Sequence, residues 1–282
     1  MPVDNAVKDL IALAFNGVRT MTGTLFRPLS FPRLIGVARR DGESIVFRCM
    51  SIDSQGLDAE SSVGFEFANV RTAEHLLAFV SQHGPLLPLP PGLVLGEGVA
   101  RGMTTLRTPI DVRESVDELL AEAAELRALV HASLDARKAE DGDDQAGRRL
   151  ARFVETRHLD DWAVGAGLES RSLLVTYHCA AAFVDHLRGA RAFVQVAGPG
   201  RFEIRLVADS LLGSCYVNVA RGLAEKHPIK VCVGCERVFV VVDSRQVFCE
   251  PKCAGRQRAK RFQEKKPKSL KGLPDGKTTR TR

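Results

Sequence analysis

The sequence has few large aromatic residues and no long apolar run. One Trp and two Tyr occur among 282 residues, and no stretch approaches the roughly 18 consecutive apolar residues of a membrane span. Residues 1–17 lack the basic start and sustained apolar core of a secretory signal. These absences predict a soluble, cytoplasmic protein that makes no use of a membrane.

The sequence also lacks a recognisable catalytic motif. The turn at 198–200 has neither the glycine spacing nor the Lys of a phosphate-binding loop, and no Ser or Cys stands in a nucleophile elbow. Two groups of polar residues offer acid–base chemistry: His158 with Asp160 and Asp161, and Tyr177, His178 and Cys179 with His186. We interpret the first as a helix cap and the second as interior polar groups, and we expect no enzymatic activity.

An excess of positive charge is found only at the end of the chain. Residues 252–282 carry 12 Lys+Arg and 2 Asp+Glu, a net charge of +10, whereas the other 251 residues carry 28 and 32, a net charge of −4. An acidic body with a basic end is typical of a protein with a polyanionic partner.

The first 226 residues predict a mixed α+β body. Hairpins are expected at 33–50, around Asp41-Gly42, and at 191–207. Apolar periodicity and caps predict helices from Thr72 to Gly84 and over 111–138, 148–166, 170–187 and 209–225, with a Pro-rich connector at 85–98 and a loop at 139–147. His227-Pro228 ends the last helix, and we place the domain boundary there.

Four of the seven cysteines fall close together, which is the strongest pattern in the chain. Cys232, Cys235, Cys249 and Cys253 form the spacing C-x2-C-x13-C-x3-C. Without a secretory signal, such pairs are more typical of a metal site than of disulfides, and zinc prefers four thiolates in a tetrahedron. The sequence therefore predicts one structural Zn²⁺, because four thiolates leave no open position for catalysis.

The segment 227–266 around these cysteines predicts a small treble-clef-like zinc finger. We expect a strand over 237–242, a turn at 243–245, a returning strand at 246–248 and a helix over 251–266 whose first turn supplies ligands. The apolar residues available for its core are few: Phe239, Val241, Phe248 and Phe262. The metal is expected to supply the missing stability.

The helix after the cysteines is predicted to be a nucleic-acid-binding element. Gly255, Ala259 and Phe262 share one face, which we expect to rest on the first cysteine pair. The residues expected to contact phosphates or bases are Arg256, Arg258, Lys260, Arg261 and Lys265. Residues 267–282 have the composition of a disordered basic tail.

The segment from Cys232 to Phe262 resembles the CGNR zinc finger. Cys253 and Arg256 match the outer letters of that motif, Asp243-Ser244 matches its turn, and Lys260 and Phe262 fall where the family has a Lys and an aromatic residue. Ala254-Gly255 replaces the family's Gly-Asn. The resemblance implies a bacterial transcription regulator, and the order of elements in the body is similar to the ABATE domain that precedes this finger.

These observations predict a zinc-dependent DNA-binding regulator. Its α+β body would sense a small-molecule effector or form a homodimer, and its finger would contact DNA. A finger that docks an acidic protein or binds RNA is the alternative, because both use basic zinc modules. An enzyme with a pocket in the body is a third interpretation, which the absence of a catalytic motif disfavours.

Overall fold

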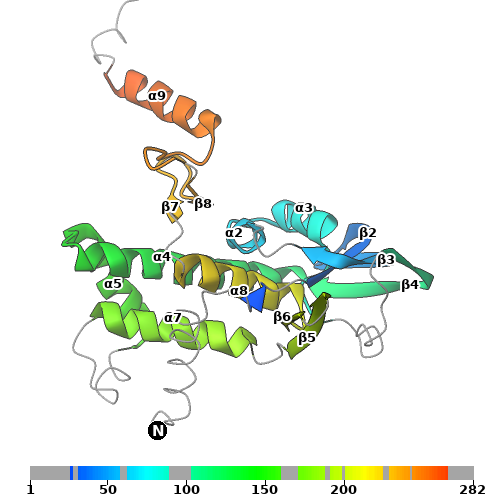
Figure 1. The fold of residues 1–282 in the computed structure, drawn as a ribbon. Coiled ribbons are helices and arrows are strands. Elements are labelled where there is room, and N and C mark those ends of the chain that lie inside the picture. Colours follow the sequence, from blue (N-terminus) through cyan, green and yellow to red (C-terminus); the bar gives the residue numbers. More distant parts are fainter. Residues whose placement is uncertain are drawn as a thin grey trace, which may run out of the picture.

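The structure of the chain is a computed structural model, and it describes residues 26–27, 31–57, 62–88, 103–159, 171–187, 191–198, 201–224, 229–241 and 243–265. These residues form an α+β body and, over 229–265, a small C-terminal finger (Figure 1). Most of the Pro-rich connector, the pair Asp160-Asp161 and the tail after 266 were singled out by the sequence and lie outside the described residues.

The first sheet of the body is antiparallel and has the order β2-β3-β4. Its strands are β2 (Phe31–Asp41), β3 (Ser44–Leu57) and β4 (Met103–Ser115). Gly42 has φ 60° in the tight turn between β2 and β3, a backbone conformation that glycine adopts without strain. The hairpin predicted around Asp41-Gly42 is confirmed.

The second sheet has the order β1-β6-β5. The strands β5 (Arg191–Gly198) and β6 (Arg201–Val207) pair antiparallel, which confirms the second predicted hairpin. The two-residue strand β1 (Phe26–Arg27) adds to β6 in parallel.

Two short helices follow β3, and the second of them lies beside the first sheet. They are α2 (Val63–Ala68) and α3 (Ala73–His83). The Thr72 hydroxyl accepts a hydrogen bond from the His75 backbone at 3.3 Å, and Gly84 ends α3 with φ 97°. Both predicted caps of α3 are confirmed, since Thr satisfies a free N–H at the start and Gly adopts the left-handed conformation at the end.

The long helix α4 (Val116–Glu140) begins five residues later than the sequence predicted. Residues 111–115 belong to β4, where Val112 pairs with Phe47 of β3. Val112 and Glu114 are buried in alternation with exposed neighbours, so this stretch satisfies the two-residue period of a strand as well as the helical spacing. Ser115 caps the helix by accepting from the Glu118 backbone at 3.4 Å.

The following loop is shorter than predicted. Helix α5 (Asp144–Thr156) begins inside the segment 139–147, because the Asp143 carboxylate accepts hydrogen bonds from the Gln145 and Ala146 backbones at 2.9 and 3.0 Å. An Asp in this position satisfies two otherwise free N–H groups and nucleates the first turn. The helix ends at Thr156, well short of the predicted residue 166.

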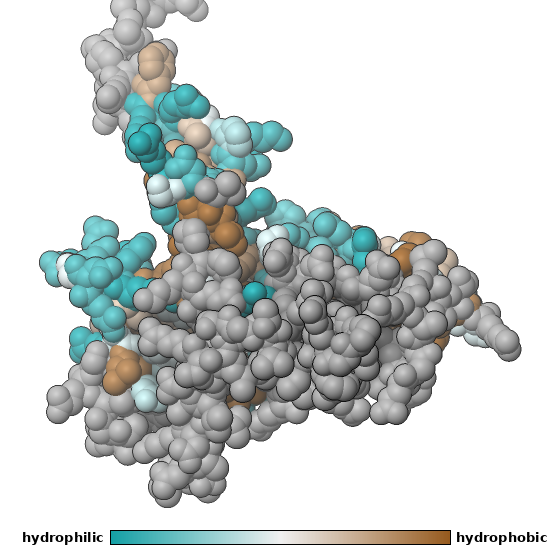
Figure 2. Space-filling model, in the orientation of Figure 1, coloured by the Kyte–Doolittle hydropathy of each residue, from teal (hydrophilic) through white to brown (hydrophobic). Residues whose placement is uncertain are grey.

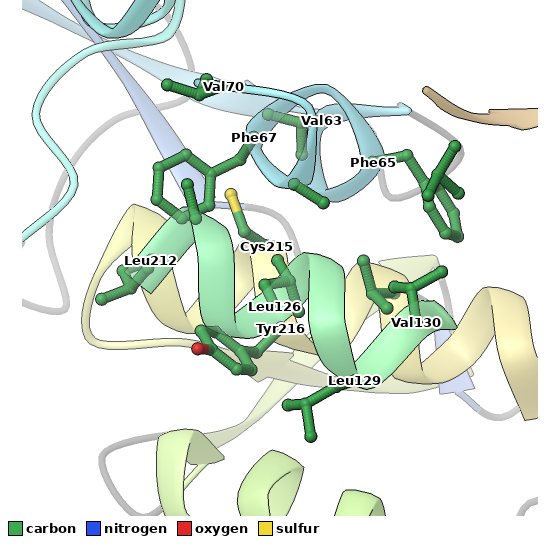
Figure 3. Packing of buried hydrophobic residues seen from close by; sticks show 14 of the residues in the cluster. Val63, Phe65, Phe67, Val70, Leu126, Leu129, Val130, Leu212, Cys215 and Tyr216 are labelled. Carbon is green, nitrogen blue, oxygen red and sulfur yellow. The ribbon is translucent and has the colours of Figure 1, made fainter. Parts of the chain in front are cut away.

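The core lies where α2, α4, α7 (Arg171–Leu187) and α8 (Leu211–Ala224) meet. Figure 3 shows Phe67 of α2, Leu126 of α4 and Cys215 of α8 converging in its centre. A Cβ on Gly64 would lie 2.3 Å from the Cys215 carbonyl oxygen, so α2 crosses α8 at a distance that only glycine allows.

Among the described residues of the body, one carboxylic acid is buried. Glu114 of β4 is 1% exposed, and its Oε1 accepts hydrogen bonds from the Leu86 and Leu87 backbones, both at 2.6 Å. Burial outweighs these two hydrogen bonds and raises the pKa of Glu114 to about 7. The Leu86 carbonyl in turn accepts from the Leu212 backbone at 2.9 Å, so Glu114 fixes a segment that touches α8.

Candidate metal centre and basic helix

The finger begins with a short hairpin that carries the first cysteine pair at its tip. Its strands are β7 (Ile229–Val231) and β8 (Val238–Val240), which pair antiparallel. The Cys232 backbone N–H donates to the Arg237 carbonyl, and its carbonyl accepts from the Glu236 N–H, both at 2.8 Å. This tight turn brings the sulfurs of Cys232 and Cys235 to one side.

The strands of the finger differ from the prediction. The expected strand at 237–242 is shortened to three residues, and 246–248 forms no strand. The partner of β8 is β7, which precedes the first cysteine pair. The Lys230 ammonium instead holds the later segment by donating to the Ser244 and Gln246 carbonyls.

The second cysteine pair lies at the start of α9 (Pro251–Lys265), which confirms the predicted helix. Cys249 precedes the helix, and Cys253 is its third residue. A Cβ on Gly234 would lie 3.2 Å from the Cys253 carbonyl oxygen and 3.3 Å from its Cβ. A residue without a side chain between Cys232 and Cys235 therefore lets the two cysteine pairs approach each other.

The four cysteine sulfurs lie within 4.8 Å of one another. The Sγ atoms of Cys235 and Cys249 are 3.5 Å apart, and those of Cys249 and Cys253 are 3.7 Å apart. A zinc ion with four Zn–S bonds of about 2.3 Å places neighbouring sulfurs about 3.8 Å apart. The donor set and its spacing fit a tetrahedral metal ion, and all four positions would be filled by the protein.

The surroundings of the sulfurs favour the thiolate of Cys232 and disfavour those of Cys249 and Cys253. Burial acts to raise the pKa of Cys232, but the backbone N–H groups of Cys249 and Gly234 donate to its sulfur and lower that pKa to about 7. Burial and the neighbouring sulfurs raise the pKa of Cys249 and of Cys253. A bound cation would relieve the repulsion among four thiolates, so the site suits a metal ion.

The face of α9 that touches the rest of the finger is not the predicted one. Cys253 is buried, and the Gln257 side-chain amide donates to the Val233 carbonyl at 3.2 Å. Gly255, Ala259 and Phe262, which we expected to rest on the first cysteine pair, are exposed, and the Phe262 side chain is 67% exposed. The prediction of Phe262 as a core residue is wrong, because the described contacts that hold α9 against the finger come from Cys253 and Gln257 in its first two turns.

The predicted nucleic-acid-binding residues all lie on α9. Arg256, Arg258, Lys260 and Arg261 are exposed, and Lys265 is the last residue of the helix. In Figure 1, α9 lies on the far side of the cysteine site from the body, and Figure 2 shows hydrophilic side chains over much of the visible face of the finger. The cations are therefore accessible to a large partner.

The finger is fastened to the body through α2, which the sequence analysis missed. Asn69 ends α2, and its side-chain amide donates to the Val238 carbonyl at 2.7 Å while its oxygen accepts from the Val238 N–H at 2.9 Å. Arg71 reaches the Cys235 and Glu236 carbonyls, each at 3.4 Å. Val238 is 2% exposed and belongs to the same apolar cluster as the body core. No local motif marks Asn69, because its partner lies 169 residues away.

The polar residues singled out in α7 are part of the packing of the body, whereas His158 is not. In α7, the Cys179 thiol is 3% exposed and donates to the Leu129 carbonyl, and burial lowers the pKa of His178. The His186 ring stacks on Tyr216 with 3.5 Å between ring centroids. His158 is exposed with φ 51° just after α5.

A small cavity lies between α4, α7 and α8. Its volume is about 170 Å³, and Ser133, Arg137, Cys179, Phe183 and Leu223 are among the residues that line it. The Arg137 guanidinium also donates to the Leu223 carbonyl near the end of α8. Small-molecule sites are usually larger, about 300 Å³ or more, so the effector expected from the sequence stays a prediction.

No protein-family model matches the chain, and no curated protein matches it in sequence. Across the described residues, no helix combines the length and the apolar character required to cross a bilayer. The chain is thus defined by its α+β fold and by a cluster of four cysteines able to bind a metal ion.

Proposed function

We propose that the chain is a zinc-dependent DNA-binding protein and acts as a transcription regulator. The observation that carries this proposal is the position of α9. A four-cysteine site holds its first turn, and the cations Arg256, Arg258, Lys260 and Arg261 are exposed along the rest. Helices that present Arg and Lys from a small zinc module bind DNA grooves in several unrelated folds.

Charge supports a nucleic acid as the partner. The net charge of +10 over residues 252–282 is attached to a body of net charge −4, so the attraction is confined to one end. Each Lys or Arg that neutralises a phosphate releases condensed counterions, which supplies affinity without any base contact. The resemblance of the finger to the CGNR zinc finger supports the more specific role in transcription.

Zinc would have a structural part in this function. Cys232, Cys235, Cys249 and Cys253 would hold it, and it would supply the stability that the few apolar residues of the finger cannot. The buried residues among the described part of the finger are few and make a very small core: Ile229, Cys232, Val238, Val241 and Cys253. The position of α9 therefore depends on the metal, and DNA binding is expected to depend on it too.

Fluorescence anisotropy of a labelled 24-base-pair duplex with the full chain tests the proposal. The logarithm of affinity should fall with the logarithm of salt, with a slope of about 0.9 per phosphate neutralised. Arg256→Ala combined with Arg258→Ala should weaken binding and reduce the slope. The matched control is Arg148→Ala, which removes an exposed arginine of α5 and should change neither. Absent or salt-independent duplex binding by the zinc-loaded chain would contradict the proposal.

A protein-interaction module is the second candidate, and one observation favours it. Val233 and Val247 are 58% and 44% exposed, and they are adjacent because the Val233 N–H donates to the Val247 carbonyl at 3.3 Å. Two exposed valines beside the metal site would suit a contact with a second copy of this chain. Sedimentation of the wild type and of Val233→Ser with Val247→Ser tests this: dimers lost in the variant, together with salt-independent DNA binding, would favour the second candidate.

A further inference from the structure

The helix α9 has an inner and an outer side, and the contacts of its first two turns define them. Cys253 and Gln257 face the rest of the finger, the first through the buried sulfur site and the second through its hydrogen bond to Val233. Successive residues of an α-helix are about 100° apart, so Gly255, two positions after Cys253, lies on the opposite side. A Cβ added to Gly255 would meet nothing within 4 Å.

The outer side is made of small and apolar residues. Gly255, Ala259 and Phe262 follow at the spacing i, i+4 and i+7, which places them in one row, and all three are exposed. Phe262, which ends the row, is the one aromatic residue in the described part of α9. The row is therefore a candidate contact surface.

Cations border this row on both sides. Lys252 and Arg256 lie three residues before Gly255 and Ala259, respectively, and Arg258 lies four residues before Phe262. By the same helical period, these three residues flank the row. Lys260 and Arg261 lie three and four residues after Gln257 and so continue the inner side. The five exposed cations thus divide into a flanking set and an inner set.

We propose that the outer side of α9 enters the major groove of DNA and that Phe262 contacts the C5-methyl group of a thymine. This inference rests on the proposed function and names the residues that face the bases. The major groove is about 12 Å wide and admits one helix, and among base edges the thymine methyl is the group that apolar side chains contact. Gly255 and Ala259 let the helix approach the bases, while Lys252, Arg256 and Arg258 contact the phosphates on either side.

Thymine-to-uracil replacement tests the contact made by Phe262. Duplexes are selected with the wild-type chain from a pool with a random 14-base-pair core, and each thymine of a selected duplex is replaced in turn by deoxyuridine, which lacks the methyl group. One replacement should weaken wild-type binding about fourfold, the value of one buried methyl-sized group. The same replacement should not affect Phe262→Ala, whereas Phe262→Leu should keep part of the effect.

Two arginines of α9 test which side of the helix faces the DNA. Arg258→Ala and Arg261→Ala remove the same charge from exposed positions three residues apart. Arg258→Ala should lower the salt slope by about 0.9, the value of one phosphate contact, and Arg261→Ala, on the inner side, should lower it by less. Zinc content and far-ultraviolet circular dichroism check that each variant keeps the finger folded.

The outcomes separate this inference from the proposed function. Salt-dependent duplex binding with no uracil effect at any position, or with equal effects of the two arginine variants, would overturn the inference and leave DNA binding in place. Loss of all duplex binding would overturn both. A preference for single strands that disappears in Phe262→Ala would also overturn it, because it would indicate base stacking in place of groove contact.

Discussion

Glu114 makes the stability of the body depend on pH in a direction opposite to that of most carboxyl groups. In the unfolded chain its pKa is near 4.5, and in the folded chain burial raises the pKa to about 7. Raising the pH from 4.5 to 7 therefore ionises Glu114 in the unfolded chain first. The folded state is fully stabilised below pH 4.5 and loses stability as the pH rises toward 7, because the unfolded state binds fewer protons in that window.

The size of this effect follows from the two pKa values. A shift from 4.5 to about 7 corresponds to about 3.4 kcal/mol at 1.36 kcal/mol per pKa unit. About 3 kcal/mol should already be lost at pH 7, which is a large part of the roughly 5–15 kcal/mol that stabilises a typical domain. Glu114→Gln keeps an oxygen that can accept from Leu86 and Leu87 but cannot ionise, so it should remove this loss.

Urea unfolding of the full chain, followed by circular dichroism between pH 4 and pH 8.5, measures the effect. The difference in the free energy of unfolding between E114Q and the wild type should rise from near zero at pH 4 to about 3 kcal/mol at pH 7 and then level off. The titrations of the histidines and cysteines are shared by both proteins and cancel in this difference. A difference that is constant, or that grows as the pH falls, would refute the reasoning.

Two further predictions concern the finger. Cys249→Ser should lower the zinc content from about one ion per chain to near zero and unfold the finger while the helices of the body stay folded; metal analysis and circular dichroism check this, and normal zinc content would contradict it. Asn69→Ala should cost about 2–4 kcal/mol, because both backbone groups of Val238 lose their partner. Urea unfolding and hydrogen exchange over β8 measure that cost. Gln257→Ala, which removes one exposed hydrogen bond, serves as the control and should cost under about 1 kcal/mol.

The metal site could be predicted because it depends on residues that are close together in the sequence. Two cysteine pairs with short internal spacing place their sulfurs together whenever each pair forms a turn, whatever the rest of the chain does. The structure brings all four sulfurs within 4.8 Å. The start of α9 followed for the same reason, since Cys253 must lie in a turn that points toward the first pair. The hairpins could be predicted for the same reason, because the turn residues between the strands determine them, as Gly42 with its φ of 60° does for one of them.

Features that depend on distant contacts could not be predicted in this way. Residues 111–115 have apolar positions compatible with a helix and with a strand, and the pairing with β3 decides between them. The apolar row of α9 was assigned to the interior because buried helices show such rows. Only the anchoring of α9 through its first turns shows that the row is exposed. The role of Asn69 could be recognised only from the structure, which places its partner Val238 beside it.

The two hydrogen bonds between Asn69 and Val238 attach the finger to the body at one place, so a rotation of the finger about this contact would move the far end of α9 most. The 15 residues of α9 span about 22 Å at 1.5 Å per residue. A tilt of about 10° at this contact would move the far end of a rod of that length by about 4 Å, close to the 3.4 Å that separate successive base pairs. A tilt of the finger by that amount would therefore move the tip of the helix by about one base-pair step. A small rotation where the finger meets the body would therefore change the position of the far end of α9.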